Sequence, residues 1–383
     1  MMNKFTLKYI LLTPSFLFLF IWCLIIYIAY ALFGGVFISY NQLLILFKII
    51  IIPSLLSGVI FFFSNLRIVK PQGIPQNRYV LIPKRAHSII IYIIVFIAIL
   101  EIIFSGGVPL VWAVLGMSKN YTDFGIPSIH GLWNGLMMAM GLIYLDEFLS
   151  GNKKSKWKFL AIILVYVILI ARGIIVALFI QSLFLFLLRK KISFGLVFKS
   201  VIAIIIVAGL FGLLGDLRSE YNIYESSFVA DSKLNIGIFT WFALYLLTPV
   251  INIVNYITPL TYFHFVGFGQ TLGPLFPSFI RGLLGFESEK ADLVNEAFNI
   301  SSYILPFYLD GGVVYVFLFT FITLVICEIV YRRHVKRGAF PSVTILLYMC
   351  IMTVFSNQFT SLPFLFEFIL LRFFEKKYLH YKD

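Results

Sequence analysis

The chain has 383 residues, of which 61% are hydrophobic and only 12% are charged. Soluble domains are roughly half apolar and about a quarter charged, so this composition excludes a water-soluble fold. The formal net charge is +13, but Lys and Arg occur in short clusters between apolar runs. This pattern is typical of membrane topology signals and excludes a basic domain that binds nucleic acid. We therefore expect one membrane domain over residues 1–383.

Apolar runs with almost no charge recur along the chain, and each is a candidate membrane span. They lie at about 10–33, 43–64, 88–105, 131–149, 157–188, 196–214, 238–257, 312–331, 341–356 and 361–374. No small-residue cleavage site follows the basic start of the first run, so we expect this run to remain as the first span. The pattern predicts an all-α polytopic integral membrane protein with about 10–12 transmembrane helices.

Basic residues indicate the expected orientation. Lys4 and Lys8 precede the first run, and Lys376 and Lys377 follow the last one. Short segments rich in Lys and Arg stay in the cytoplasm, so both termini are expected there. Loops such as 106–130, which are nearly free of these residues, are expected on the outer side.

The run 157–188 is too long for one span, because a single helix of this length would reach roughly 48 Å. A single span would also place the basic cluster 189–191 outside. A hairpin of two short spans keeps that cluster inside. Its turn is expected at Ala171-Arg172-Gly173, where glycine permits a sharp reversal, and this would place Arg172 below the outer membrane surface.

The segment 238–300 also breaks the alternation, since one span there would bring the basic cluster 332–337 outside. Pro249 and Pro259 interrupt this segment, and its sequence VGFGQTLGPLFPSFIRGLLGF is rich in Gly and Pro. Such sequences favour broken helices and loops that enter the membrane where protein covers them. We expect 215–311 to form a large outside lobe that partly re-enters the bilayer.

Charges within spans or at their outer ends are the first candidates for chemistry, because a charge at the bilayer centre costs at least about 2.5 kcal/mol. Arg172, Arg218 and Arg281 are three separated arginines in outer segments with few other cations. A guanidinium donates paired hydrogen bonds to phosphate oxygens, so together they predict a diphosphate site. The alternative for each is a structural or loop charge. For Lys48 and Glu367, in the middle of apolar runs, we expect tertiary pairing.

Several residues of the outer segments are candidate bases or polar contacts. A carboxylate or a neutral histidine can deprotonate an attacking hydroxyl, and Tyr rings stack on sugars. The alternative for each is a cap, a packed histidine or a loop charge, and Asp310 before two glycines would cap the helix that follows. The candidates are His130, Asp216, Glu220, Tyr262, His264, Glu287, Glu289 and Asp310.

Common nucleotide and metal motifs do not occur in the sequence. There is no Walker A, G-x-S-x-G, H-E-x-x-H or paired C-x-x-C sequence, so ATP hydrolysis, serine hydrolase chemistry and structural zinc have no support. We expect neither a cofactor nor a metal.

The succession EIIFSGGVPLVWAVLG, NYTDFGIPSIHGL, ILIARGIIVALFIQ, LLGDLRSEY and NISSYILPFYLDGG resembles the O-antigen polymerases, the Wzy-type oligosaccharide repeat unit polymerases, over about Glu101 to Val330. The resemblance implies a multi-pass protein of the bacterial inner membrane whose active site faces the periplasm. It implies transfer of a growing glycan, with inversion, from its undecaprenyl diphosphate carrier to a lipid-linked repeat unit. The implied partners are the two lipid-linked oligosaccharides, membrane lipids and a chain-length regulator protein.

The resemblance also suggests roles for the candidate residues. The expected catalytic residues are Arg172, Arg218, Arg281, Asp310 and His264. The expected substrate-binding residues are His130, Asp216, Tyr262, Asn299 and Ser301.

Other functions stay open. A flippase or another transporter for lipid-linked oligosaccharides has a similar composition, but transporters usually carry internal repeats, and none is visible here. For an O-antigen ligase, neither His130 nor His264 lies in the full histidine pattern of that family. A membrane acyltransferase is a further alternative.

Overall fold

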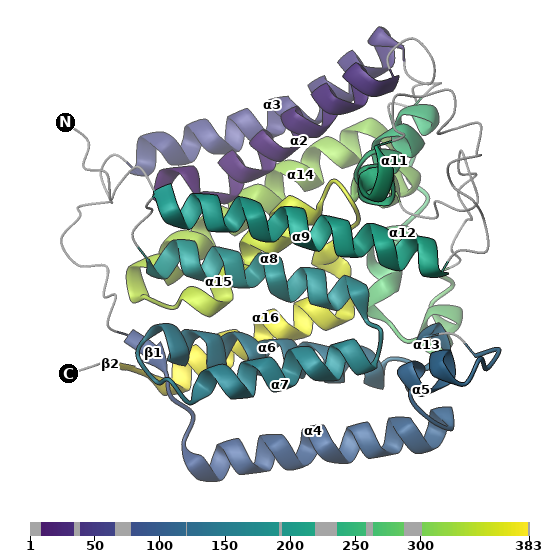
Figure 1. Cartoon of the computed structure of the whole chain (residues 1–383). Helices are drawn as coiled ribbons and strands as arrows, with labels where there is room; N and C mark the ends of the chain where they lie inside the picture. Colours follow the sequence, from purple (N-terminus) through teal and green to yellow (C-terminus); the bar gives the residue numbers. More distant parts are fainter. Residues whose placement is uncertain are drawn as a thin grey trace.

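The computed structural model describes residues 9–33, 39–65, 78–119, 121–190, 194–218, 236–257, 263–286 and 301–381. Most helices lie side by side and run between the same two ends of the molecule (Figure 1). At one end, which we call the terminal end, strand β1 (Arg78–Val80) pairs antiparallel with strand β2 (Leu379–Tyr381). At the opposite end, which we call the loop end, lie the short helices α5 (Pro109–Val114), α12 (Gly269–Leu272) and α13 (Ser278–Leu283).

Long apolar helices make up most of the described chain. Six segments are long and apolar enough to cross a membrane: Pro14–Leu32, Tyr40–Phe61, Lys84–Val114, Arg172–Arg189, Gly237–Tyr256 and Ile304–Arg337. The predicted all-α polytopic membrane protein is confirmed, while the number of spans stays a prediction. The long helices are α2 (Pro14–Phe33), α3 (Tyr40–Asn65), α4 (Lys84–Ser105), α6 (Ile129–Leu149), α7 (Ser155–Ile168), α8 (Arg172–Arg189), α9 (Phe194–Arg218), α11 (Thr240–Tyr256), α14 (Ile304–Arg337), α15 (Phe340–Met352) and α16 (Leu362–Tyr378).

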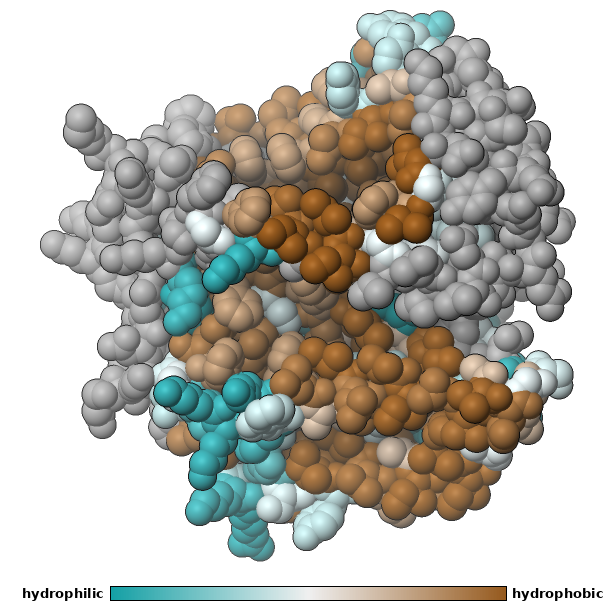
Figure 2. Space-filling model, in the orientation of Figure 1, coloured by the Kyte–Doolittle hydropathy of each residue, from teal (hydrophilic) through white to brown (hydrophobic). Residues whose placement is uncertain are grey.

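The outer surface of the bundle is apolar. Tyr92, Phe96 and Ile103 of α4 are exposed, as lipid-facing side chains are. Figure 2 shows hydrophobic side chains across this face of the helices and a group of hydrophilic ones towards the terminal end. This arrangement suits a protein whose middle is surrounded by hydrocarbon and whose end meets water.

Helix α6 is the central helix of one half of the bundle. It packs against α4, α7, α8 and α16, and nearly every residue from 133 to 147 is buried. A Cβ added at Gly135 would lie 2.5 Å from the carbonyl oxygen of Pro363, so glycine is needed for the close contact with α16. Because protein surrounds α6, it accommodates polar residues such as Asn134 and Asp146.

The predicted hairpin in 157–188 is present. Helix α7 ends at Ile168 and α8 begins at Arg172, so the chain reverses where the sequence indicated. The reason given for the position of the turn was wrong, however. Ile170 adopts the left-handed backbone conformation, with φ 51°, whereas Gly173 lies within α8.

The structure describes parts of the predicted lobe 215–311. Within it, α11 packs against α2 and α9, and its residues Leu244, Leu247 and Val250 belong to the hydrophobic core. This part of the segment is therefore embedded among the helices. The location of the lobe on the outer side of a membrane stays a prediction.

A buried ion pair joins two helices near the terminal end. The Arg189 guanidinium donates from Nε to Asp146 Oδ1 at 2.6 Å and from Nη2 to Asp146 Oδ2 at 2.7 Å. Both side chains are almost fully buried, and the guanidinium also lies over the Phe340 ring, 4.6 Å from its centroid. Two parallel bonds between buried charges fix the ends of α6 and α8 relative to each other.

Replacing one member of this pair is expected to cost more stability than replacing both. Arg189→Met leaves the Asp146 carboxylate buried without a cation, which costs about 3–5 kcal/mol, whereas Asp146→Asn with Arg189→Met removes both charges. We expect the midpoint of thermal unfolding in detergent to fall strongly in the single variant and to recover in part in the double variant. Lys154→Met, at an exposed position, is the control. Equal midpoints for the single and double variants would contradict this account.

Candidate functional site

The loop residues 263–286 dock onto the first part of α14 at the loop end. The Val266 backbone N–H donates to the Asp310 carbonyl oxygen at 3.0 Å. Phe265 and Phe268 pack against Tyr315 of α14, with ring centroids 6.3 and 6.0 Å apart. Hydrogen bonds and aromatic packing therefore connect this loop to a long apolar helix.

Asp310 is the anchor of this contact. Its Oδ1 accepts the Gln270 N–H at 3.0 Å, and its Oδ2 accepts the Thr271 N–H at 2.8 Å. The carboxylate is buried and caps the first turn of α12, whose N–H groups would otherwise have no partner. A helical run does follow the break at Gly312, but the expectation that Asp310 caps it was wrong, because both carboxylate oxygens accept from α12 instead. The catalytic role expected for Asp310 stays a prediction.

His264 has one nitrogen engaged and one without a partner. Its Nε2 lies 3.0 Å from the Leu309 carbonyl oxygen, and a carbonyl only accepts, so Nε2 carries the proton. Nδ1 is buried and has no hydrogen-bond partner in the described part of the chain. The ring lies edge-on to Tyr308. A neutral imidazole with its proton on Nε2 would leave Nδ1 as the atom able to act as a general base.

Arg281 belongs to the same loop. It lies on α13 and is half-buried, and its Cδ would be 3.5 Å from a Cβ at Gly273. Its Nε is buried and has no hydrogen-bond partner among the described residues. Gly273 directly follows α12, the turn that Asp310 caps. Asp310 and Arg281 therefore contact neighbouring residues of one loop.

The other two arginines of the predicted diphosphate site also lie at the loop end. Arg172 is the half-buried first residue of α8, which begins there, and Arg218 is the last residue of α9, which returns there (Figure 1). The side chain of Arg218 lies outside the described part. Convergence of the three guanidinium groups on one diphosphate stays a prediction.

The remaining candidates divide into two groups. Outside the described residues lie Glu220, Tyr262, Glu287, Glu289 and Asn299, and so does the side chain of Asp216 on α9. Ser301 is described and half-buried. It precedes the fully buried Ser302, whose Oγ accepts the Ile304 N–H at 3.3 Å.

His130 has a fixed partner within the bundle. Its Nδ1 lies 3.0 Å from Glu101 Oε2, and the Glu101 carboxylate is fully buried. The ring stacks on Trp133 and meets Phe124 edge-on. A Cβ added at Gly125 would lie only 2.6 Å from this ring. These contacts give His130 a packing role between α4 and α6, and substrate binding by it stays a prediction.

Sequence reasoning gave no role to Glu101, although it is the most buried charge near the loop end. The signal was a lone glutamate within an apolar run, which indicates an internal partner. Nearby, Lys119 Nζ donates to the Ser105 carbonyl oxygen at 2.8 Å and lies 5.3 Å from the Trp112 ring centroid. In the described ranges, no group of three or more His, Cys, Asp and Glu side chains is arranged to hold a metal ion.

The fold and these contacts define a polytopic α-helical membrane protein with a largely apolar loop, which carries His264 and Arg281, docked at one end. Comparison with known proteins adds no closer assignment: no protein-family model, no curated protein and no solved structure matches the chain.

Removal of the Asp310 carboxylate is expected to loosen the docked loop. Asp310→Ala loses two bonds to a charged acceptor, each contributing about 1.5–3 kcal/mol. We therefore expect trypsin to cleave after Arg281 at least about tenfold faster, while Asp310→Asn, which keeps one acceptor oxygen, gives an intermediate rate. Asp123→Ala, at an exposed position of the same end, should cleave at the unmodified rate. Unchanged cleavage in Asp310→Ala would show that the carboxylate does not hold the loop.

Proposed function

We propose that the chain is an O-antigen polymerase, which transfers a growing glycan from undecaprenyl diphosphate to a lipid-linked repeat unit. The observation that carries the proposal is the docked loop, where His264 Nδ1 and Arg281 Nε are buried without hydrogen-bond partners among the described residues and Asp310 anchors the backbone. A base for the attacking hydroxyl and a cation for the leaving diphosphate are the two groups that inverting transfer requires.

The charge distribution supports an orientation for this reaction. Lys and Arg crowd the terminal end, where α4, α7, α14 and α16 carry basic residues at their ends. By the positive-inside rule this end faces the cytoplasm, so the loop end faces the periplasm of a bacterial inner membrane. Flipped lipid-linked sugars are found on that side, and the cleavage of the lipid diphosphate bond needs no nucleotide there.

Each residue of the docked loop has a task in the proposed reaction. His264 Nδ1 takes the proton of the attacking sugar hydroxyl as the new glycosidic bond forms and the bond to the lipid diphosphate breaks. Arg281, with Arg172 and Arg218, binds the departing diphosphate, because forked donors neutralise charge on several oxygens at once. Asp310 positions the loop. The apolar helix surfaces hold the polyprenyl tails.

Deletion of the gene tests the proposed activity directly. Loss of a polymerase leaves a lipopolysaccharide core that carries a single repeat unit, because export and ligation continue. Complete loss of the surface polysaccharide on a gel would instead indicate a ligase or a flippase and would reject the proposal.

The arginines are expected to be irreplaceable by lysine, because an ammonium cannot form the forked pair of bonds. Arg172→Lys and Arg281→Lys should each lose most polymer length at matched expression. Arg218→Lys should be less severe, because its loop is expected to be more solvated. The readout is the length distribution of the polysaccharide in a deletion strain that carries each variant.

Arg337→Lys is the matched control, since it makes the same substitution at the terminal end of the bundle. It should leave polymer length unchanged. Normal polymer length in both Arg172→Lys and Arg281→Lys would reject the shared diphosphate site.

A further inference from the structure

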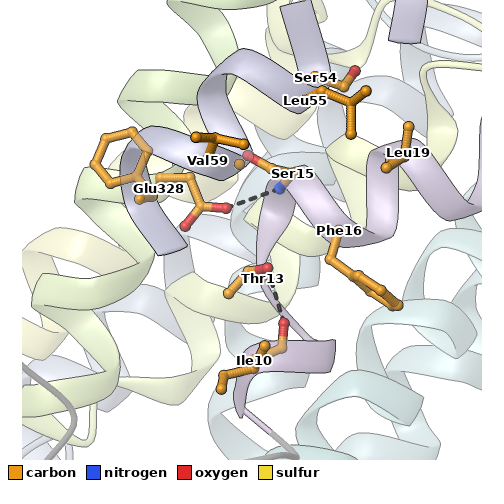
Figure 3. Close-up of a pocket in the computed structure, with 11 residues that line it drawn as sticks. Ile10, Thr13, Ser15, Phe16, Leu19, Ser54, Leu55, Val59 and Glu328 are labelled. Carbon is orange, nitrogen blue, oxygen red and sulfur yellow. Dashed lines mark hydrogen bonds between the residues drawn. The ribbon is translucent and has the colours of Figure 1, made fainter. Parts of the chain in front are cut away.

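A second polar site lies in a cavity between α2, α3 and α14, far along α14 from the docked loop. The cavity has a volume of about 230 Å³ and is lined mainly by apolar side chains, among them Phe16, Leu19, Leu55 and Val59. Figure 3 shows Val59 next to the Glu328 side chain, and Phe16 and Leu19 on the other side of Ser15. Phe16, Leu55 and Val59 are 39%, 48% and 51% exposed, so the cavity opens sideways onto the lipid-facing surface.

Glu328 has an oxygen without a partner in this cavity. The residue is 1% exposed, and its Oε1 accepts the Ser15 N–H at 2.9 Å (Figure 3). Its Oε2 is buried and has no hydrogen-bond partner among the described residues. A carboxylate oxygen in an apolar, water-poor space needs a donor, because a buried charge without one is strongly destabilised.

The hydroxyl groups around the cavity are engaged with partners other than Glu328 Oε2. Thr13 Oγ1 donates to the Ile10 carbonyl oxygen at 2.9 Å, and Ser54 Oγ donates to the Ile50 carbonyl oxygen at 2.6 Å. Ser15 and Ser57 bond to each other through their hydroxyl oxygens, 2.9 Å apart. Among the described residues no donor to Glu328 Oε2 is present, so an occupant of the cavity can supply one.

Arg332 adds a positive group one helical turn further along α14. Its Nη2 donates to the Phe61 carbonyl oxygen at 2.5 Å, and its guanidinium lies 4.3 Å from the Phe61 ring centroid. Its Nε is buried without a partner in the described part of the chain. Residues four apart on a helix are neighbours, with about 5–6 Å between their Cβ atoms, yet Glu328 and Arg332 do not pair among the described ion pairs.

We propose that this cavity binds a phospholipid whose headgroup carries a primary ammonium. The ammonium donates to Glu328 Oε2, the phosphate accepts from Arg332 Nε, and one acyl chain lies along Phe16, Leu19 and Leu55. Neighbouring opposite charges on the protein match the ammonium and phosphate of one zwitterionic headgroup. Arg332 begins the basic segment 332–337 that ends α14, and basic residues at a helix end lie at the level of lipid headgroups.

A lipid retention assay tests this site. The protein, reconstituted in nanodiscs with equal parts of phosphatidylethanolamine, phosphatidylcholine and phosphatidylglycerol, is extracted into detergent, and its retained lipids are quantified by mass spectrometry. Phosphatidylcholine has the same net charge as phosphatidylethanolamine but no N–H donor. We expect at least about tenfold retention of the ethanolamine lipid over the choline lipid, typical of a charge-assisted bond.

Two variants separate this site from general lipid adhesion. Glu328→Gln keeps an acceptor for the Ser15 N–H but removes the charge, so the preference should fall to about threefold or less. Val59→Trp fills the cavity from α3 and should also lower retention of the ethanolamine lipid. Glu375→Gln is the matched control, because Glu375 Oε1 accepts the Ser342 N–H at 2.8 Å away from this cavity, and its preference should match that of the unmodified protein.

Two results would overturn the proposal. One is the absence of a preference for the ethanolamine lipid in the unmodified protein, seen either as equal retention of the choline lipid or as preferential retention of phosphatidylglycerol. The other is an undiminished preference in both Glu328→Gln and Val59→Trp.

Discussion

A carboxylate inside this bundle finds no bulk water, so it needs a donor from another part of the chain. Association of helices in lipid lacks the hydrophobic driving force that acts in water, and polar contacts and close packing therefore matter more. Four internal carboxylates of the described bundle are each bonded to another segment, which limits how the helices can be arranged. The pairs are Asp146 with Arg189, Glu101 with His130, Glu367 with Gln181, and Glu328 with the Ser15 N–H.

The helices were predictable from the sequence, but most of these pairs were not. Apolar runs report the length of a span directly, and the basic cluster 189–191 was enough to divide 157–188 into a hairpin. A pairing partner depends on packing between segments that are far apart in sequence, as Ser15 and Glu328 are. Tertiary pairing was expected for Glu367 and is present, whereas Lys48 is exposed on α3 and has no ion pair among the described residues.

In the candidate site, too, the residues were predictable from the sequence but their contacts were not. The sequence indicated His264, Asp310 and Arg281 as candidate residues, and all three belong to the docked loop and the helix turn that holds it. The sequence did not show which groups bond to each other there. Asp310 looked like a cap for its own helix, but its carboxylate caps α12, from which it is separated by about 40 residues of chain. Only the fold brings an acceptor to those N–H groups.

The sequence Asp310-Gly311-Gly312 connects the docked loop to the membrane helix through a backbone requirement. Gly312 has φ 74° and ψ −164° within α14, a conformation that is essentially restricted to glycine. A Cβ at Gly311 would lie 2.5 Å from the Tyr315 ring, so the two glycines permit both the break and the approach of the tyrosine. The break ends the regular helix directly after the residue whose carboxylate and carbonyl hold the loop. A change in the direction of the first turns of α14 would therefore move Asp310, and with it the loop that carries His264 and Arg281, while the remainder of α14 stays packed in the bundle.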